Sequence, residues 1–139
     1  MSRLTRGLCE LTLQTSDPAA LADFYRRVLG FEELSRDDDR IWLACGPTTR
    51  LGLWSPGEKE FGDEGGHHVH HAYSTTRGAL AEIGRRLDAL GVAFKGPVEH
   101  DGGDRSLYFE DPEGNLVEAW DFFESGDGAR DGVAALAES

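Results

Sequence analysis

The sequence predicts an α+β protein built from two similar modules, each consisting of a strand, a helix and three further strands. The order strand, helix, three strands occurs twice along the chain. The two expected helices also read alike, with ALADFYRRVLGF in the first and ALAEIGRRLDALGV in the second. The copies are about sixty residues apart, which indicates an internal duplication that covers most of the chain.

The first module is expected to begin with a strand over residues 8–15, where apolar and polar side chains alternate. Asp17 and Pro18 are typical of the N-cap and first residue of a helix. Its apolar side chains recur at i, i+3, i+4, i+7 and i+8 from Leu21, and Gly30 is suited to end it. Short strands are expected at residues 31–34, 41–45 and 50–54.

The second module is expected to repeat this order with a strand over residues 68–73. Leu80, Ile83, Leu87 and Leu90 mark an amphipathic helix that Gly91 ends, and strands are expected at residues 92–98, 106–110 and 115–121. We therefore expect one domain over residues 1–123, with module one at 8–54, a linker at 55–67 and module two at 68–123. Residues 124–139 are expected to form a loose tail with room for a short terminal helix.

The composition is that of a globular domain with an acidic surface. The chain has 139 residues and a formal charge of −12. A protein that tracks phosphates needs a basic face, so the charge argues against binding to nucleic acid or to an anionic membrane. It favours cations, either metal ions or basic small molecules, although solubility alone also accounts for such a charge.

No stretch of the sequence indicates a membrane span or a secretory signal. The apolar runs are too short to cross a bilayer, and the first residues are not followed by an apolar signal segment, so we expect a cytoplasmic protein. Cys9 and Cys45 lie far apart and outside any C-x-x-C pattern. We expect both to be buried free thiols.

The stretch from residue 106 to residue 121 predicts a hairpin with an unusual carboxylate in its second strand. Residues 111–114, with the letters DPEG, have the composition of a tight turn. Strand alternation places Glu118 between Leu116 and Trp120 on one face. A carboxylate on a dry face costs several kcal/mol unless it is paired or bound to a cation. The alternative is that this strand lies at a sheet edge and Glu118 faces water.

These features together resemble the vicinal-oxygen-chelate superfamily, which includes glyoxalase I, bleomycin-resistance proteins, fosfomycin-modifying enzymes and extradiol dioxygenases. The segment SDPAALADFYRRVLGF resembles the family's first helix, and YFEDPEGNLVE resembles its last hairpin, so the resemblance spans about residues 8–123. It implies that the two modules form a half-open mixed β-barrel with the helices outside. It also implies a divalent metal on the concave face and a homodimer.

Transferred residue by residue, the resemblance places the metal ligands at Glu10, His70 and Glu118. His68 lies on the same strand face as His70 and is the alternative ligand if the register differs by two residues. A fourth family position falls near Gly52, which has no side chain to ligate a metal. One imidazole and two carboxylates would suit Mn²⁺, Fe²⁺, Ni²⁺ or Zn²⁺. Taken singly, Glu10 is better explained as a solvated strand carboxylate, and the histidines around His70 at residues 67–71 are explained as surface residues.

The resemblance implies a metal-dependent enzyme that chelates two neighbouring oxygens of a small substrate. Glu10 or Glu118 would also act as the catalytic base. Ring-cleaving relatives use two histidines and one carboxylate, so Glu10 favours a lyase or isomerase over a dioxygenase. The alternative is a drug-binding protein of the bleomycin-resistance type, which needs no metal. The residues expected to contact the substrate are Thr12, His68, Trp54 and Trp120.

Overall fold

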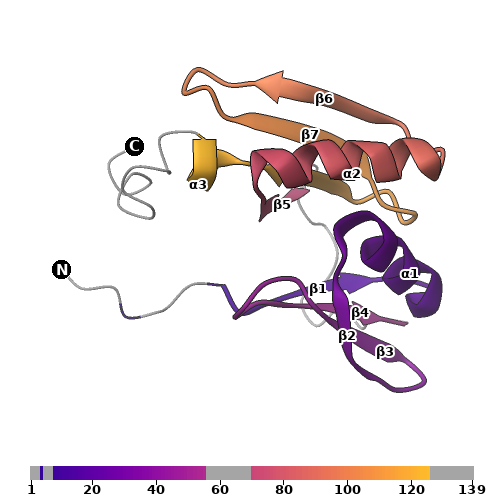
Figure 1. The fold of residues 1–139 in the computed structure, drawn as a ribbon. Coiled ribbons are helices and arrows are strands. Elements are labelled where there is room, and N and C mark those ends of the chain that lie inside the picture. Colours follow the sequence, from indigo (N-terminus) through magenta and orange to yellow (C-terminus); the bar gives the residue numbers. More distant parts are fainter. Residues whose placement is uncertain (1–3, 5–7, 56–69, 126–139) are drawn as a thin grey trace, which may run out of the picture. The chain divides into compact units, whose positions relative to one another are not determined.

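The computed structural model describes residue 4, residues 8–55 and residues 70–125. The chain divides into two compact units, residues 1–65 and residues 66–139. The element order is β1-α1-β2-β3-β4 in the first unit and β5-α2-β6-β7-β8-α3 in the second (Figure 1). The predicted order of strand, helix and three strands, occurring twice, is therefore confirmed.

The first unit contains β1 (Glu10–Gln14), α1 (Pro18–Leu29), β2 (Glu32–Arg36), β3 (Arg40–Ala44) and β4 (Arg50–Trp54). The strands form one mixed sheet in the order β1-β4-β3-β2, in which β1 is parallel to β4 and the other pairs are antiparallel. Helix α1 begins as predicted, because the Asp17 carboxylate accepts a hydrogen bond from the Ala20 amide at 3.0 Å. Gly30 ends it in the left-handed conformation, with a φ of 74°.

The core of the first unit lies between α1 and one face of this sheet. Leu21, Tyr25 and Val28 of α1 are buried at the predicted spacing. The sheet contributes alternate residues of its two central strands, which are Ile41, Leu43, Leu51 and Leu53. Trp42 and Trp54, which occupy the alternate positions of these two strands, project to the opposite face and are half-buried. This alternation leaves the second face of the sheet available for polar residues.

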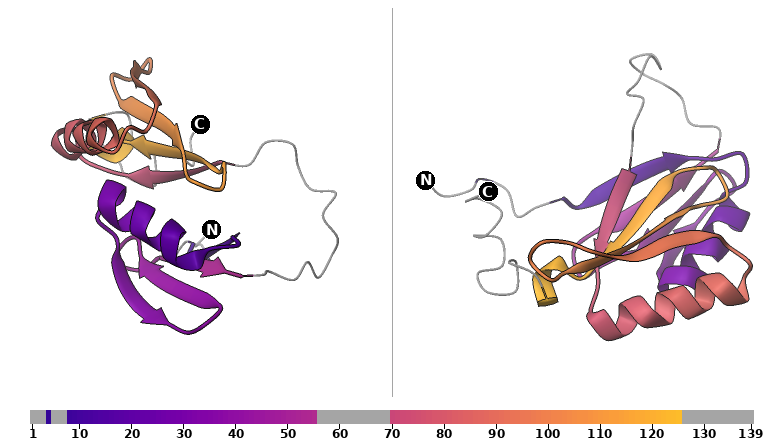
Figure 2. Two further views of the ribbon diagram at one scale, coloured as in Figure 1. Left: turned by 90° about the vertical axis from the view of Figure 1, so that its right-hand side faces the viewer. Right: turned by 90° about the horizontal axis from the view of Figure 1, so that it is seen from above.

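The second unit repeats the plan with β5 (His70–Ser74), α2 (Arg77–Ala89), β6 (Phe94–Glu99), β7 (Arg105–Glu110) and β8 (Leu116–Trp120), and ends in α3 (Phe122–Ser125). Its sheet has the order β5-β8-β7-β6, with β5 parallel to β8. Each unit has its helix against one face of its own sheet (Figure 1; Figure 2). In the second unit, Leu80, Ile83 and Leu87 of α2 are buried, as are Leu107, Phe109, Val117 and Ala119 of the sheet.

The predicted turn before β8 is confirmed. The Asp111 carboxylate accepts hydrogen bonds from the backbone amides of Glu113 and Asn115, both at 2.9 Å. Gly114 has a φ of 81°, which suits the residue that closes the turn. This geometry fixes the register of the hairpin and places Tyr108 directly opposite Glu118. The turn therefore determines which side chains face the candidate metal ligand.

Two details differ from the sequence predictions. Leu90 was expected in the buried stripe, but α2 ends at Ala89 and Leu90 is 40% exposed. Cys9 was expected to be buried, but it precedes the first residue of β1 and is exposed. Cys45 is partly buried, and burial raises the pKa of its thiol. Both cysteines are free, as expected.

Several further predictions lie outside the described residues. They concern His68, nearly all of the linker at residues 55–67 and most of the tail at residues 124–139. Among the residues that are described, no helix combines the length and apolar character needed to cross a membrane.

Candidate functional site

Glu118 lies in the interior of the second unit's sheet. Strand β8 is hydrogen-bonded to β5 on one side and to β7 on the other, so the edge-strand interpretation of this residue is wrong. Glu118 is only 7% exposed. Within the described part of the chain, no arginine or lysine forms an ion pair with it. A buried carboxylate without a cationic partner is costly, and it marks a place where a cation would be stabilised.

The two oxygens of Glu118 have different surroundings. Oε2 accepts a hydrogen bond from the Ser106 hydroxyl at 2.6 Å. Oε1 lies 3.6 Å from Nε2 of His70, which projects from the neighbouring strand β5. The His70 side chain is 39% exposed, whereas the Glu118 side chain is 9% exposed. The structure thus brings together two of the three predicted ligands, His70 and Glu118.

Ser106 connects Glu118 to a second histidine. Nε2 of His100 lies 2.9 Å from the Ser106 oxygen. An ionised carboxylate only accepts hydrogen bonds, so the single hydroxyl proton of Ser106 is donated to Glu118. The Ser106 oxygen then accepts from His100, which requires a hydrogen on Nε2 of that ring. This chain of two hydrogen bonds fixes the orientation of the carboxylate.

Tyr108 lies beside Glu118 on the same face of the sheet, because the two are register partners. Burial raises the pKa of the Tyr108 phenol above its usual value, and the negative charge of Glu118 raises it further. The phenol therefore keeps its proton at neutral pH.

Glu10, the third predicted ligand, belongs to the first unit. Its Oε1 accepts from both Nε and Nη2 of Arg50, each at 2.7 Å, across the parallel pair β1 and β4. The Arg50 guanidinium also lies 4.1 Å from the centre of the Trp42 ring. Glu10 is therefore an ion-paired carboxylate with one oxygen engaged. This partner was missed in the sequence, because the pairing of β1 with β4 crosses 40 positions of the chain.

No side chain fits at Gly52, the residue near which a fourth family position was expected. A Cβ atom at this position would lie 2.1 Å from Cζ3 of Trp42, its register partner on β3. The Trp42 ring is held there by the Arg50 guanidinium and by edge contact with Trp54, whose ring centre is 6.0 Å away. The indole thus occupies the space into which a fourth ligand would project.

We expect Gly52→Ala to destabilise the protein by about 1–3 kcal/mol, because the methyl group must displace the Trp42 ring. Urea unfolding followed by circular dichroism would measure the change. Gly46→Ala is the matched control, because a Cβ atom there has no neighbour within 4 Å. Equal stability of the two variants would show that Trp42 can move without cost.

The predicted substrate-contact residues are dispersed over both units. Thr12 is exposed on β1. Trp54 is half-buried, and its buried Nε1 has no hydrogen-bond acceptor among the described residues. Trp120 shares a sheet face with Glu118, but its Nε1 donates to the Asp104 carboxylate at 2.6 Å. The Nε1–H group of Trp54 therefore has no acceptor among the described residues, whereas that of Trp120 is hydrogen-bonded to Asp104.

Comparison with known proteins identifies the family. Residues 7–119 match the model of the Glyoxalase/Bleomycin resistance protein/Dioxygenase superfamily. The chain belongs to this superfamily. A curated relative is biphenyl-2,3-diol 1,2-dioxygenase 2 of Rhodococcus globerulus, which is 31% identical over 125 residues. The match covers 82% of this chain but only 62% of that protein.

Solved structures of superfamily proteins have the same fold. The lactoylglutathione lyase of Agrobacterium tumefaciens gives a TM-score of 0.69 at 22% identity, over 86% of this chain and 96% of that one. A genomically encoded fosfomycin resistance protein of Listeria monocytogenes, in complex with Mn(II) and sulfate ion, gives 0.67 at 22% identity, over 85% of this chain and 91% of that one. The predicted α+β class with two βαβββ modules is thereby confirmed.

Proposed function

We propose that this protein is a divalent-metal-dependent enzyme that acts on a small substrate with two neighbouring oxygens. The observation that carries the proposal is the pair formed by His70 and Glu118, in which a buried carboxylate with no arginine or lysine partner among the described residues faces an imidazole nitrogen at 3.6 Å. Glu10, proposed from the sequence as the third ligand, belongs to the first unit, and its participation remains a prediction.

Among the described residues, no three ligand-type side chains are grouped closely enough to hold a metal ion, but His70 and Glu118 offer two donors of a suitable kind. Two ligand atoms that share an ion at about 2.1 Å are about 3.0–3.4 Å apart, so the observed separation needs only a small adjustment. Nitrogen and carboxylate donors suit Mn²⁺, Fe²⁺, Ni²⁺ and Zn²⁺. Ser106 engages the second oxygen of Glu118, as partners outside the ligand set commonly do for ligating carboxylates. Glu10 likewise retains Oε2 after pairing with Arg50.

The chain's own groups suggest a division of roles in such a reaction. A bound ion would act as a Lewis acid toward the two substrate oxygens. Ser106 and His100 hold Glu118 in one orientation, which favours a fixed ligand over a base that leaves the metal. Glu10 is partly exposed and is the better candidate to accept a proton from the substrate. The protonated Tyr108 phenol would remain a donor beside the reacting oxygens.

Proton transfer, as in a lyase or isomerase, is the reaction class we favour. Non-haem iron oxygenases commonly bind their metal with two histidines and one carboxylate, whereas the proposed set has one histidine and two carboxylates. Two of the superfamily proteins compared above support different chemistries, since one is named a lyase and the other a dioxygenase. The ligand set decides our preference.

Capture of a cationic drug is less well supported. That function would need open aromatic faces, but the Arg50 guanidinium already lies 4.1 Å from the Trp42 ring centre, and that of Arg40 lies 5.3 Å from the Trp54 ring centre. The Trp120 ring is packed against Phe122, with ring centres 4.7 Å apart.

Elemental analysis of protein purified without chelators tests the proposal. We expect about one divalent ion per chain, or uptake of one ion after incubation with Mn²⁺, Ni²⁺ or Zn²⁺ followed by desalting. Absence of metal under all of these conditions would overturn the metal-dependent function. Binding of cationic drugs would then be the next property to measure.

A further inference from the structure

A row of three opposed side chains crosses the sheet of the second unit. Lys95 in β6 is the register partner of Tyr108 in β7, and Tyr108 is the partner of Glu118 in β8. Residues directly opposite one another on adjacent strands share one face of the sheet. With a strand spacing of about 4.8 Å, the backbones at Lys95 and Glu118 are about 10 Å apart. The row therefore links the candidate metal ligand to a lysine at a fixed distance.

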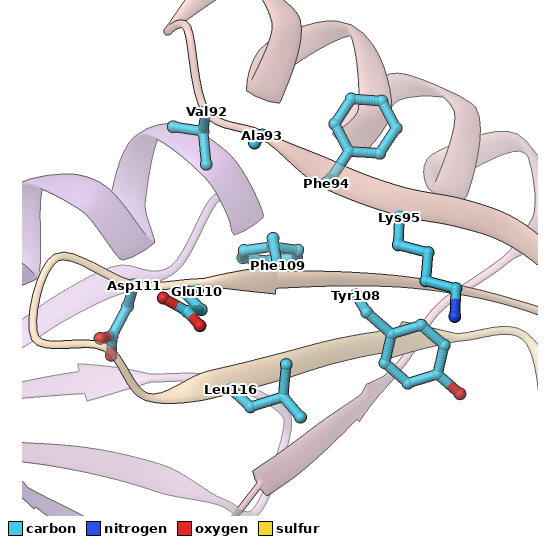
Figure 3. A pocket seen from close by; sticks show the side chains of 9 residues that line it. All are labelled: Val92, Ala93, Phe94, Lys95, Tyr108, Phe109, Glu110, Asp111 and Leu116. Atoms are coloured by element: carbon cyan, nitrogen blue, oxygen red, sulfur yellow. The ribbon is translucent and has the colours of Figure 1, made fainter.

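This row lies on the face of the sheet that α2 does not cover. Phe94 and Phe109 are register partners on the other face. The Phe94 ring lies within van der Waals reach of a Cβ atom placed at Gly84 of α2. Figure 3 shows the Phe94 ring directed toward the helix, whereas Lys95 and Tyr108 extend away from it. The ammonium and the phenol are thus presented on the same side.

Lys95 and Tyr108 line a cavity of about 590 Å³ in the second unit (Figure 3). This volume lies within the range of small-molecule sites, which are mostly apolar with a few polar groups that orient the ligand. The apolar wall is formed by Val92, Ala93, Phe94, Phe109 and Leu116, and the Tyr108 ring adds a further aromatic surface. Of the lining residues, Tyr108 and Leu116 lie on the same sheet face as Glu118, whereas Phe94 and Phe109 belong to the face that α2 covers. Glu118 itself does not line the cavity.

Lys95 is available to bind an anion. Among the described residues, its ammonium forms no ion pair. Two acidic residues, Glu110 and Asp111, line the cavity. The Asp111 carboxylate is engaged in the turn, where it accepts hydrogen bonds from two backbone amides and from the side chain of Asn115. The other, Glu110, is an exposed carboxylate two positions along β7 from Tyr108. An ammonium without an ion-pair partner at the cavity wall can form a charge-assisted hydrogen bond with an anionic ligand.

We propose that Lys95 binds a carboxylate of the substrate while the Tyr108 ring contacts its apolar middle part. The substrate class is then a small carboxylic acid with two neighbouring oxygens at its other end. The part between the oxygens and the carboxylate has about the length of one aromatic ring and a short spacer. The position of the oxygen pair rests on the proposed metal-dependent function. The anion subsite at Lys95 does not, and it can be tested on metal-free protein.

Hydrocinnamate and its primary amide are the probes for the subsite, and NMR titration of the metal-free full chain is the measurement. We expect the acid to bind at least about tenfold more tightly than the amide and to shift the backbone amide signals of Lys95 and Tyr108. Lys95→Met should remove this preference, and Lys95→Arg should retain most of it. Arg85→Met, a loss of one exposed cation from α2, is the matched control and should leave the preference intact.

Equal affinity for acid and amide, no detectable binding of the acid, or a preference that survives Lys95→Met would overturn the subsite. A second titration uses dihydrocaffeate, which adds two neighbouring hydroxyls, with and without Mn²⁺. Binding strengthened by Mn²⁺ but unaffected by Lys95→Met would support the metal-dependent function alone. An acid preference that depends on Lys95, with no effect of Mn²⁺, would support the subsite and contradict the metal-dependent function.

Discussion

Glu118→Gln is expected to lower the affinity for Mn²⁺ or Zn²⁺ by at least about 100-fold, because it removes the charge of a central ligand. The amide has nearly the same shape, and its oxygen can still accept from Ser106. In the absence of metal the variant should be as stable as the wild type or more stable, because a buried charge without a cationic partner is lost. Relative to the wild type, Glu118→Gln should therefore be as stable or more stable without metal, but less stable when the metal is present.

Calorimetric titration gives the affinity, and thermal unfolding with and without the ion gives the stability. Glu110→Gln is the matched control, because it removes one exposed negative charge from the same hairpin and should leave metal affinity nearly unchanged. Ser106→Ala should fall between the two, with a loss of about 10–100-fold, because Ser106 positions the ligand without binding the ion. Wild-type affinity in Glu118→Gln would contradict the ligand assignment.

Arg77→Ala is expected to destabilise the second unit by about 2–3 kcal/mol. Asp121 is fully buried, and its Oδ2 lies 3.1 Å from Nε of Arg77. Without the guanidinium, this buried carboxylate loses the ion pair with Arg77 but keeps the hydrogen bond from the backbone amide of Arg105, at 2.6 Å. Nη2 of Arg77 also donates to the Gly103 carbonyl at 2.5 Å. Urea unfolding measures the loss.

The position of Arg77 at the first residue of α2 sharpens this test. A cation near a helix N-terminus interacts unfavourably with the helix dipole. If this interaction were the only one that Arg77→Ala removes, the variant would be more stable than the wild type. Arg85→Ala on the same helix is the control, because its ion pair with Glu82 is exposed and should contribute less than about 1 kcal/mol. Equal effects of the two substitutions would show that burial of Asp121 carries no extra cost.

Local signals in the sequence determined the elements. The N-cap at Asp17, the left-handed Gly30 and the DPEG turn each act over a few residues, so their structural consequences follow from the letters alone. Strand alternation likewise placed Glu118 on a face shared with Leu116. The predictions failed at element ends, where Leu90 and Cys9 are exposed, because one residue of difference in where an element ends changes burial.

The partners of the candidate ligands depended on the tertiary structure. The pairing of Tyr108 with Glu118 could be predicted from the sequence, because the turn fixes the register of the hairpin. The hydrogen bond from Ser106 to Glu118 and the contact of His100 with Ser106 could not, because they depend on side-chain positions in the folded sheet. The pairing of Glu10 with Arg50 arises from parallel strands joined through a helix and two other strands, and no local pattern encodes it. The sequence by itself thus determined which residue types the site contains. Only the folded sheet of each unit decided which oxygens of the candidate ligands are engaged, namely Oε1 of Glu10 by Arg50 and Oε2 of Glu118 by Ser106.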